Sequence, residues 1–244
     1  NIDFSSIPKW KRDLIDIVGI SPDRITNTYQ SVEIPANLLA KSDEQVAREV
    51  EGLAQIAYKG YFLFWGSIEP KKNIGRMIEA YLVSKASVPL VIIGAQAWKA
   101  DQELQLLKMG AEAPENGGRR SKAVAKRIIH LPYAPFNLLV SLIRGAKAAL
   151  FPSLYEGFGL PALEAMLLGT PVICSNTASL PEVVGDAALM VDPYDTAALT
   201  AAIRQMDADA DLRAEFSRRG LAQAAIFSPA AYRGRLNTVY ERFL

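Results

Sequence analysis

The stretch FPSLYEGFGLPALEAMLLGTPVICSNTASLPEVVGDAALMVDP, residues 151–193, alternates short apolar runs with helical patterns. We expect a strand to end at Phe151 and further strands over 172–174 and 188–191, with helices over 161–168 and 180–184 between them. Short apolar runs bounded by Gly, Pro and Asn are typical of parallel strands that helices cover on both faces. The stretch therefore predicts two consecutive βαβ units.

The same alternation extends upstream of this stretch. Apolar runs predict strands over 61–65, 90–93, 127–131 and 148–151, and helical patterns lie between them over 73–85, 99–108 and 137–144. Six strands in βαβ alternation predict an α/β fold with an open, doubly wound (Rossmann-like) parallel sheet of about six strands.

The flanks of the expected sheet are helical. Ser42 and Gln45 form a capping-box pattern before a helix whose apolar stripe is Val46, Val50, Leu53 and Ile56. Three helical stretches follow the last strand, over 196–206, 211–226 and 229–243, and a loop-like insertion spans 110–122. Residues 1–40 are weakly patterned and the chain lacks an initiator Met, so we expect a piece of a longer chain.

Composition excludes several classes of protein. The net charge of +1 argues against a nucleic-acid partner, and a hydrophobic fraction of 50% argues against disorder. Cys174 is the single cysteine, which rules out an intrachain disulfide and fits a reducing compartment. No apolar run reaches the ~20 residues of a membrane span. We expect a cytoplasmic location, with membrane contact, if there is any, peripheral and at the inner face of a membrane.

The turn before the expected helix over 161–168 has the features of an anion site. Gly157 and Gly159 allow a sharp turn and a close approach of the backbone to a ligand. Pro161 suits a first helical position, where a missing N–H costs nothing. The amides of Phe158, Gly159 and Leu160 then lie at a helix N-terminus, a position that commonly binds phosphate.

Two carboxylates flank this turn. Glu156 precedes it and is placed to accept hydrogen bonds from ligand hydroxyls, and Glu164 lies about one turn into the helix, where it suits a ribose diol. A phosphate cradle between hydroxyl acceptors suits a nucleotide joined to a sugar. The alternative is that the glycines shape a loop and Glu164 offsets the helix dipole.

A dehydrogenase is a competing interpretation of the same residues. The run from Gly157 to Ala162 matches the dinucleotide fingerprint G-x-G-x-x-A. However, it falls late in the predicted sheet rather than in the first βαβ unit. The next strand also ends in Cys174-Ser175-Asn176, without an acidic residue for the ribose of NAD.

A second cluster, GSIEPKKN, spans residues 66–73 after the first predicted strand. Gly66 allows the turn, and Lys72 at the strand end is placed to reach a phosphate with a bond worth roughly 1.5–3 kcal/mol. The alternative is a solvated pair, Lys71 and Lys72, followed by Asn73 as a simple N-cap.

The loops after the next two predicted strands complete the expected site. The loop over 91–98 is placed to wall the ligand pocket, and Tyr133 is placed to contact a base, with turn formation and packing as its alternative role. His130 is the only histidine, so a hydrolytic triad has no support. No cluster has metal-ligand spacing, and we expect neither a metal nor a cofactor.

Together these motifs resemble the family-4 retaining glycosyltransferases of the GT-B fold, over residues 61–243. GSIEPKKN is similar to that family's first phosphate-binding loop, and Glu156 and Glu164 match its E-x7-E pair. The resemblance implies one half of a GT-B enzyme. Residues 41–228 would be the donor-binding domain, 1–40 the linker and end of an N-terminal acceptor domain, and 229–244 a helix that crosses toward that missing domain.

The resemblance also implies roles for individual residues. In the family, the residue that matches Glu156 sits near the donor sugar, which makes Glu156 the expected catalytic residue. The residue that matches Glu164 binds the ribose, and the lysine that matches Lys72 binds the diphosphate. The full implied donor-binding set is Gly66, Ser67, Lys71, Lys72, Tyr133, Gly157, Phe158, Gly159, Leu160 and Glu164.

The chain departs from the family pattern at two positions. Many relatives have an arginine where this chain has Ser67, so a phosphate contact is lost or supplied by Lys71, and Pro132 replaces the glycine of an HLGY-like motif. The style of the first loop resembles mannosyltransferases that use GDP-mannose. The implied activity is sugar transfer from that donor to a glycan or lipid-linked acceptor. A non-catalytic nucleotide-sugar-binding module and another GT-B enzyme, such as a phosphorylase or an epimerase, are the alternatives.

Overall fold

The structure, a computed structural model, describes residues 9–54, 56–97 and 127–242. The helix expected over 99–108 and the insertion expected over 110–122 lie outside the described residues.

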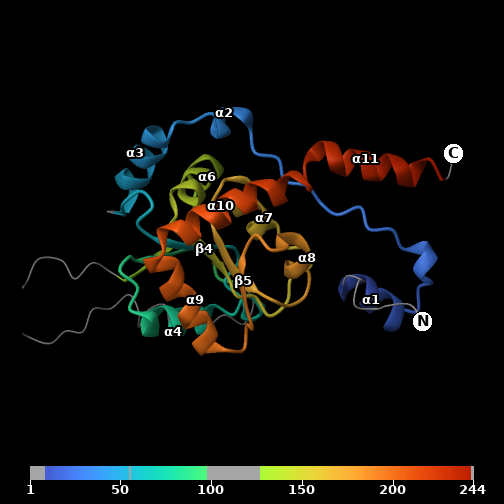
Figure 1. Ribbon diagram of the computed structural model, residues 1–244, viewed down its shortest axis with the longest axis horizontal. Coiled ribbons are helices and arrows are strands. Elements are labelled where there is room, and N and C mark those ends of the chain that lie inside the picture. Colours follow the sequence, from blue (N-terminus) through green and yellow to red (C-terminus); the bar gives the residue numbers. More distant parts are fainter. Residues whose placement is uncertain (1–8, 55, 98–126, 243–244) are drawn as a thin grey trace, which may run out of the picture.

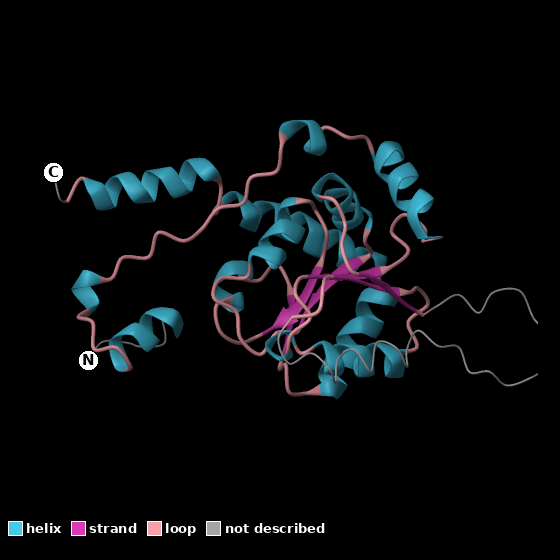
Figure 2. Ribbon diagram, turned by 180° about the vertical axis from the view of Figure 1, so that it is seen from behind, coloured by secondary structure: helices cyan, strands magenta, loops and turns pink. Residues whose placement is uncertain are grey.

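A parallel sheet of six strands forms the centre of the molecule, as Figure 2 shows in magenta. The strands lie in the order β3-β2-β1-β4-β5-β6, and every neighbouring pair is parallel. The predicted doubly wound sheet is therefore confirmed. The strands are β1 (Phe62–Trp65), β2 (Leu90–Ile93), β3 (Ile128–Leu131), β4 (Ala148–Phe151), β5 (Val172–Ser175) and β6 (Leu189–Val191).

The continuous apolar runs are explained by burial. All residues of β1, β2, β4 and β5 are buried, whereas the edge strands β3 and β6 are partly exposed. A strand covered on both faces has no side that faces solvent, so its sequence does not alternate between apolar and polar residues. Cys174 lies in β5 with no exposed surface, and burial raises the pKa of its thiol to about 12.

Helices cover both faces of the sheet (Figure 1). On one face, α4 and α9 pack against each other, and on the other α3 packs on α6, and α10 on α7 and α8. The helices are α3 (Asp43–Ala54), α4 (Ile74–Ser84), α6 (Phe136–Gly145), α7 (Leu160–Leu167), α8 (Leu180–Val184), α9 (Thr196–Ala208) and α10 (Ala210–Ala225).

The capping box before α3 is confirmed, because Ser42 and Gln45 exchange side-chain to backbone hydrogen bonds of 2.8 and 3.3 Å. The expected apolar stripe is shorter than predicted. Val46 and Val50 are buried, but Leu53 is 40% exposed and Ile56 is buried only after the helix has ended. The helical periodicity stops at residue 54, so residues beyond it cannot continue the stripe.

The two ends of the described chain extend away from the sheet, on the same side of it (Figure 1). They contain α1 (Lys9–Asp16) and η2 (Pro22–Arg24) at the start, and α11 (Pro229–Tyr240) at the end. The short helix α2 (Ala36–Leu39) does not belong to this extended part, because it lies against α6 (Figure 1). No residue of α11 is buried. None of the described helices is long and apolar enough to span a bilayer.

An aromatic cluster joins the incoming and outgoing segments to the turn before α7. The ring of Tyr29 lies edge-on to Phe227 at 5.4 Å, and Phe158 lies 5.7 Å from Phe227. Arg235 on α11 stacks over Tyr29 at 5.3 Å and donates to the Thr28 carbonyl at 2.7 Å. Both connections to the sheet domain therefore meet beside Phe158.

Candidate functional site

Lys72, Glu156 and the glycine turn before α7 lie at the switch point of the sheet. From β1 the chain crosses to β2 on one side, and from β4 it crosses to β5 on the other, so the strand order reverses between β1 and β4. Ligands of open α/β sheets bind in the crevice outside the carboxyl ends of such strands. The loop over 66–73 leaves β1 and the turn over 152–159 leaves β4, and the Leu154 amide donates to the Lys71 carbonyl at 2.8 Å.

The turn after β4 ends in the N-terminus of α7. Leu160 is its first residue and Pro161 its second, one position earlier than predicted. Gly159 has a φ of +103°, and a Cβ there would lie 2.7 Å from Leu180 Cδ2. A Cβ on Gly157 would meet open space. Among the described residues no side chain caps α7, so its first amides are available to an anion.

Lys72 and Glu156 form an ion pair across the switch point. Lys72 Nζ lies 2.7 Å from Glu156 Oε1, and their side chains are 13% and 11% exposed. The Ser153 hydroxyl donates to the same carboxylate oxygen at 2.8 Å, and the Ser179 hydroxyl donates to the Glu156 carbonyl at 2.9 Å. The two residues assigned to phosphate and sugar thus lie together, and each neutralises the other.

Glu164 lies beside the end of β1. The indole Nε1 of Trp65 donates to Glu164 Oε2 at 2.8 Å. Burial raises the pKa of Glu164, and the Trp65 hydrogen bond lowers it in part. Glu164 therefore lies at the carboxyl end of β1, the strand from which the loop that carries Lys72 leaves.

The remaining residues of the first loop have different surroundings. Gly66 has a φ of +138°, as expected for a tight turn, and a Cβ on Gly94 would lie only 1.8 Å from the Gly66 carbonyl oxygen. Ser67 donates to Glu69 at 2.8 Å, and Lys71 lies 3.4 Å from Glu69 and is 54% exposed. Ser67 and Lys71 thus lie with Glu69 rather than with Glu156.

Asn73 is not the simple N-cap of the alternative interpretation. It precedes α4 in the left-handed region, with φ 59°, but its side chain makes no capping hydrogen bond. Its amide donates instead to the carbonyls of Pro152 at 2.9 Å and Pro193 at 2.7 Å. Asn73 therefore ties the loops that follow β4 and β6 to the start of α4.

Tyr133 is not brought to the other predicted residues. It follows β3 at the edge of the sheet, two strands from β1, and is 76% exposed. His130 lies nearby, with Nε2 2.9 Å from the Gly94 carbonyl oxygen. Within residues 9–54, 56–97 and 127–242, no group of His, Cys, Asp or Glu side chains is arranged to hold a metal ion.

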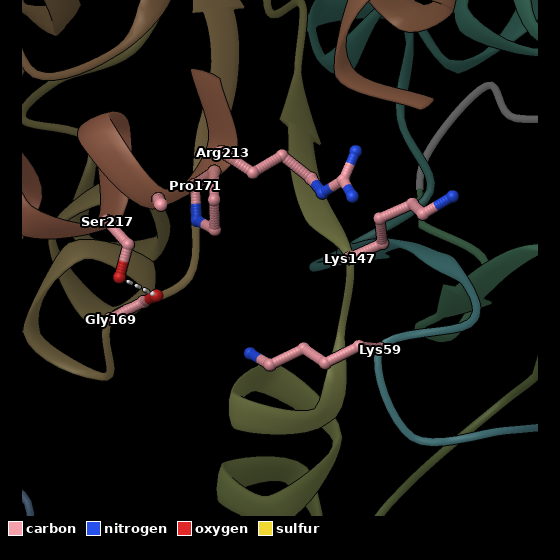
Figure 3. A pocket seen from close by; sticks show the side chains of 7 residues that line it. Lys59, Lys147, Gly169, Pro171, Arg213 and Ser217 are labelled. Carbon is pink, nitrogen blue, oxygen red and sulfur yellow. Dashed lines mark hydrogen bonds between the residues drawn. The ribbon is translucent and has the colours of Figure 1, made fainter. Parts of the chain in front are cut away.

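A cavity of about 290 Å³ lies at the amino-terminal ends of β4 and β5, beside the residues that precede these strands (Figure 3). Its cations are already engaged. Lys147 lies 2.6 Å from Asp207, Arg213 donates to the Met206 carbonyl at 2.7 Å, and Lys59 donates to the Arg144 carbonyl. Basic groups at the last carbonyls of α6 and α9 are typical of helix C-caps. We therefore assign these cations a structural role.

Sequence reasoning missed Trp65 and Ser153 as neighbours of the carboxylates. Trp65 ends a wholly apolar strand, and an indole at such a position is expected in the core. Its partner is 99 residues away in the chain, and no pattern of spacing connects them. The sequence offered one chemical indication of this contact, because the N–H of a buried indole usually needs a hydrogen-bond acceptor.

Known proteins match the chain in sequence and in fold. The family model described as "Glycosyl transferases group 1" matches residues 53–223. O-antigen chain mannosyltransferase B from Escherichia coli is 42% identical over 222 residues, which is 89% of this chain and 54% of that protein. The serotype-specific mannosyltransferase WbdA from Escherichia coli is 31% identical over 221 residues, 89% of this chain and 26% of that protein.

Solved structures share the fold at low sequence identity. Anabaena Alr3699/HepE in complex with UDP and glucose gives a TM-score of 0.78 at 17% identity, over 95% of this chain and 60% of that one. A UDP-forming α,α-trehalose-phosphate synthase from Burkholderia vietnamiensis gives 0.71 at 16% identity, over 95% and 59%. This chain spans about half the length of the mannosyltransferase B that it matches. On the family model and these relatives, the chain belongs to the group 1 glycosyl transferases.

Proposed function

We propose that the chain is the donor-binding half of a retaining mannosyltransferase that uses GDP-mannose. The observation that carries the proposal is the grouping of Lys72, Glu156, Glu164 and the uncapped start of α7 at the switch point between β1 and β4. The names of the relatives support the mannosyl group, and the style of the first loop supports the GDP nucleotide. The acceptor site would belong to another domain.

In this proposal the diphosphate lies between Lys72 and the first amides of α7. As the bond from sugar C1 to phosphate oxygen breaks, the electron pair stays on the diphosphate, and the ammonium and the helix dipole stabilise it. Glu156 orients the sugar. The acceptor hydroxyl bonds to C1 on the face that the diphosphate leaves, its proton passes to a departing phosphate oxygen, and the configuration is retained.

Calorimetric titration of the chain with GDP-mannose, GDP, UDP and NAD tests the proposal. We expect GDP-mannose and GDP to bind, and Glu164→Ala to lose most of that binding. Glu79→Ala is the matched control, since Glu79 is exposed on α4 and makes no contact with the site. Binding of NAD without GDP would overturn the proposal, and binding of UDP alone would refute the assigned nucleotide.

The two neighbouring lysines separate a phosphate role from a general charge effect. Lys72→Ala should weaken the binding of GDP more than that of guanosine, because the lost contact is to the diphosphate. Lys71→Ala, which removes the exposed neighbour, should weaken GDP binding less. An equal loss for GDP and guanosine in the Lys72 variant would contradict the phosphate role.

A further inference from the structure

The Trp65 indole is fixed in place by its packing. Trp65 is the last residue of β1 and is 6% exposed. Its ring lies edge-on to Phe151 at the end of β4, with centroids 4.7 Å apart and an interplanar angle of 84°. A ring held in this way has little freedom to turn its N–H. The direction of its 2.8 Å hydrogen bond to Glu164 is therefore set by the core of the sheet.

The charged groups on the helices packed against α7 are engaged elsewhere. On α8, Glu182 accepts a 3.0 Å hydrogen bond from Asn27. On α10, Glu215 pairs with Arg218 at 2.8 Å and with Arg219 at 2.7 Å. Arg213, the remaining cation of α10, donates to the Met206 and Asp207 carbonyls at 2.7 and 3.1 Å. Within the described chain, the cations of these helices are therefore engaged away from Glu164, and its pKa responds only to burial and to Trp65.

The strands beside α7 offer no cation either, within the same described ranges. The thiol of Cys174 on β5 is neutral at physiological pH, because burial raises its pKa to about 12. Lys72, which lies in the loop after β1 at the end of the 3-10 turn η3 (Pro70–Lys72), is already paired with Glu156. A desolvated carboxylate without a cation depends on neutral donors to stay charged. For Glu164 the donor is the Trp65 indole N–H.

We propose that Trp65 is a positioning residue for the nucleotide, which holds Oε2 of Glu164 so that Oε1 faces the crevice and accepts a hydrogen bond from the ribose diol. This inference rests on the proposed function, and goes beyond it by naming a residue that does not itself touch the ligand. An indole at the end of β1 thus makes the second carboxylate of the site selective for ribose hydroxyls.

The ligand-free chain provides the first test. In a ¹H–¹⁵N spectrum, the indole resonance that disappears in Trp65→Phe belongs to Trp65. We expect that resonance to shift with pH, with a midpoint above the ordinary glutamate value of 4.5, and we expect Glu164→Gln to abolish the shift. A Trp65 resonance that does not respond to pH in the wild-type chain would overturn the proposal, whatever the chain binds.

Nucleotide binding provides the second test, with GDP and 2′,3′-dideoxy-GDP as probes. Trp65→Phe keeps an aromatic ring but removes the N–H. We expect it to weaken GDP binding about tenfold, the loss typical of one hydrogen bond to a charged group, and to leave dideoxy-GDP unchanged. Phe151→Leu, which loosens the same packing and keeps the N–H, should weaken both probes equally or neither.

The outcomes separate this inference from the proposed function. If the wild-type chain binds GDP and Trp65→Phe binds it equally well, the positioning role is wrong and the donor site stands. If Trp65→Phe weakens both probes to the same extent, the indole has only a packing role, and the proposal is overturned. If the wild-type chain binds neither probe, the proposed function fails. The pH response of the indole resonance then shows only whether Trp65 and Glu164 interact.

Discussion

At the scale of single residues, the candidate site is held in a self-neutralised state. Lys72 and Glu156 pair with each other at 2.7 Å, and both side chains are largely buried. In the proposed function, an incoming diphosphate would therefore compete with Glu156 for the lysine. Charge is available to the ligand only after this internal pair has opened.

Glu156→Gln should bind GDP more tightly than the wild-type chain does, by about tenfold. The substitution removes the charge that competes for Lys72 and repels phosphate, an effect of about 1.4 kcal/mol by the usual strength of charged hydrogen bonds. Calorimetry with GDP measures it, and guanosine, which carries no phosphate, is the control ligand. Weaker GDP binding by the glutamine variant would show that Glu156 contributes to holding the nucleotide.

Glu164→Gln should raise the melting temperature at neutral pH. Burial raises the pKa of Glu164 in the folded chain above its unfolded value, so the folded state binds the proton more tightly. Ionisation therefore costs stability as the pH rises through the folded pKa, and the cost is absent below the unfolded value near 4.5. Glutamine removes this cost and keeps an acceptor for Trp65.

Melting curves across the acidic range check the sign of this effect. The gain from Glu164→Gln should be full at neutral pH and should vanish below about pH 4, where both states of the wild-type carboxyl are protonated. Glu79→Gln, on the exposed face of α4, should show no such trend. A gain that persists unchanged in acid would refute the burial argument.

At the scale of elements, the strands were predicted to within one residue at each end because burial on both faces leaves a continuous apolar run. The contacts between elements were not predictable in the same way. The Lys72–Glu156 pair spans 84 residues and the Trp65–Glu164 pair 99, and both depend on the strand order at the switch point. Local periodicity carries no information on which loop ends meet.

Asn73 is the residue through which three elements are joined. Asn73→Gly keeps the left-handed backbone but removes two buried hydrogen bonds, to Pro152 and Pro193. We expect a loss of about 2 kcal/mol, or roughly 4–8 °C in melting temperature. Lys85→Gly is the matched control, because exposed Lys85 has a similar φ of 55°. Equal effects of the two changes would show that the side chain of Asn73 contributes nothing.

At the scale of the whole molecule, the sequence predicted a terminal helix but not its position. The amphipathic pattern of this helix is weak, so the sequence did not indicate which element the helix packs against. In the structure, α11 buries no residue and lies away from the sheet (Figure 1). The aromatic contacts of Tyr29 were missed for a related reason, because the segment around it has no periodic pattern. These positions are set by tertiary contacts of individual side chains.

Removal of residues 229–244 should leave the sheet domain folded. The described helix contributes chiefly the contacts of Arg235 with Tyr29 and Thr28, so we expect the melting temperature to fall by less than about 4 °C. Circular dichroism measures both the lost helix and the melting point. Leu199→Ala, at a buried position of α9, should cost more, about 2–5 kcal/mol. A larger drop on truncation would mean that α11 packs on the sheet domain.

The burial of Cys174 has a practical consequence for labelling α11 with a spectroscopic probe. The chain's single thiol has no exposed surface and an elevated pKa, so maleimide reagents should leave the folded protein unlabelled. A cysteine introduced on the exposed side of α11, such as Asn237→Cys, would then be the one reactive position. A fluorophore or spin label attached there would report the surroundings of α11 without background from the core, and no native cysteine would have to be removed first.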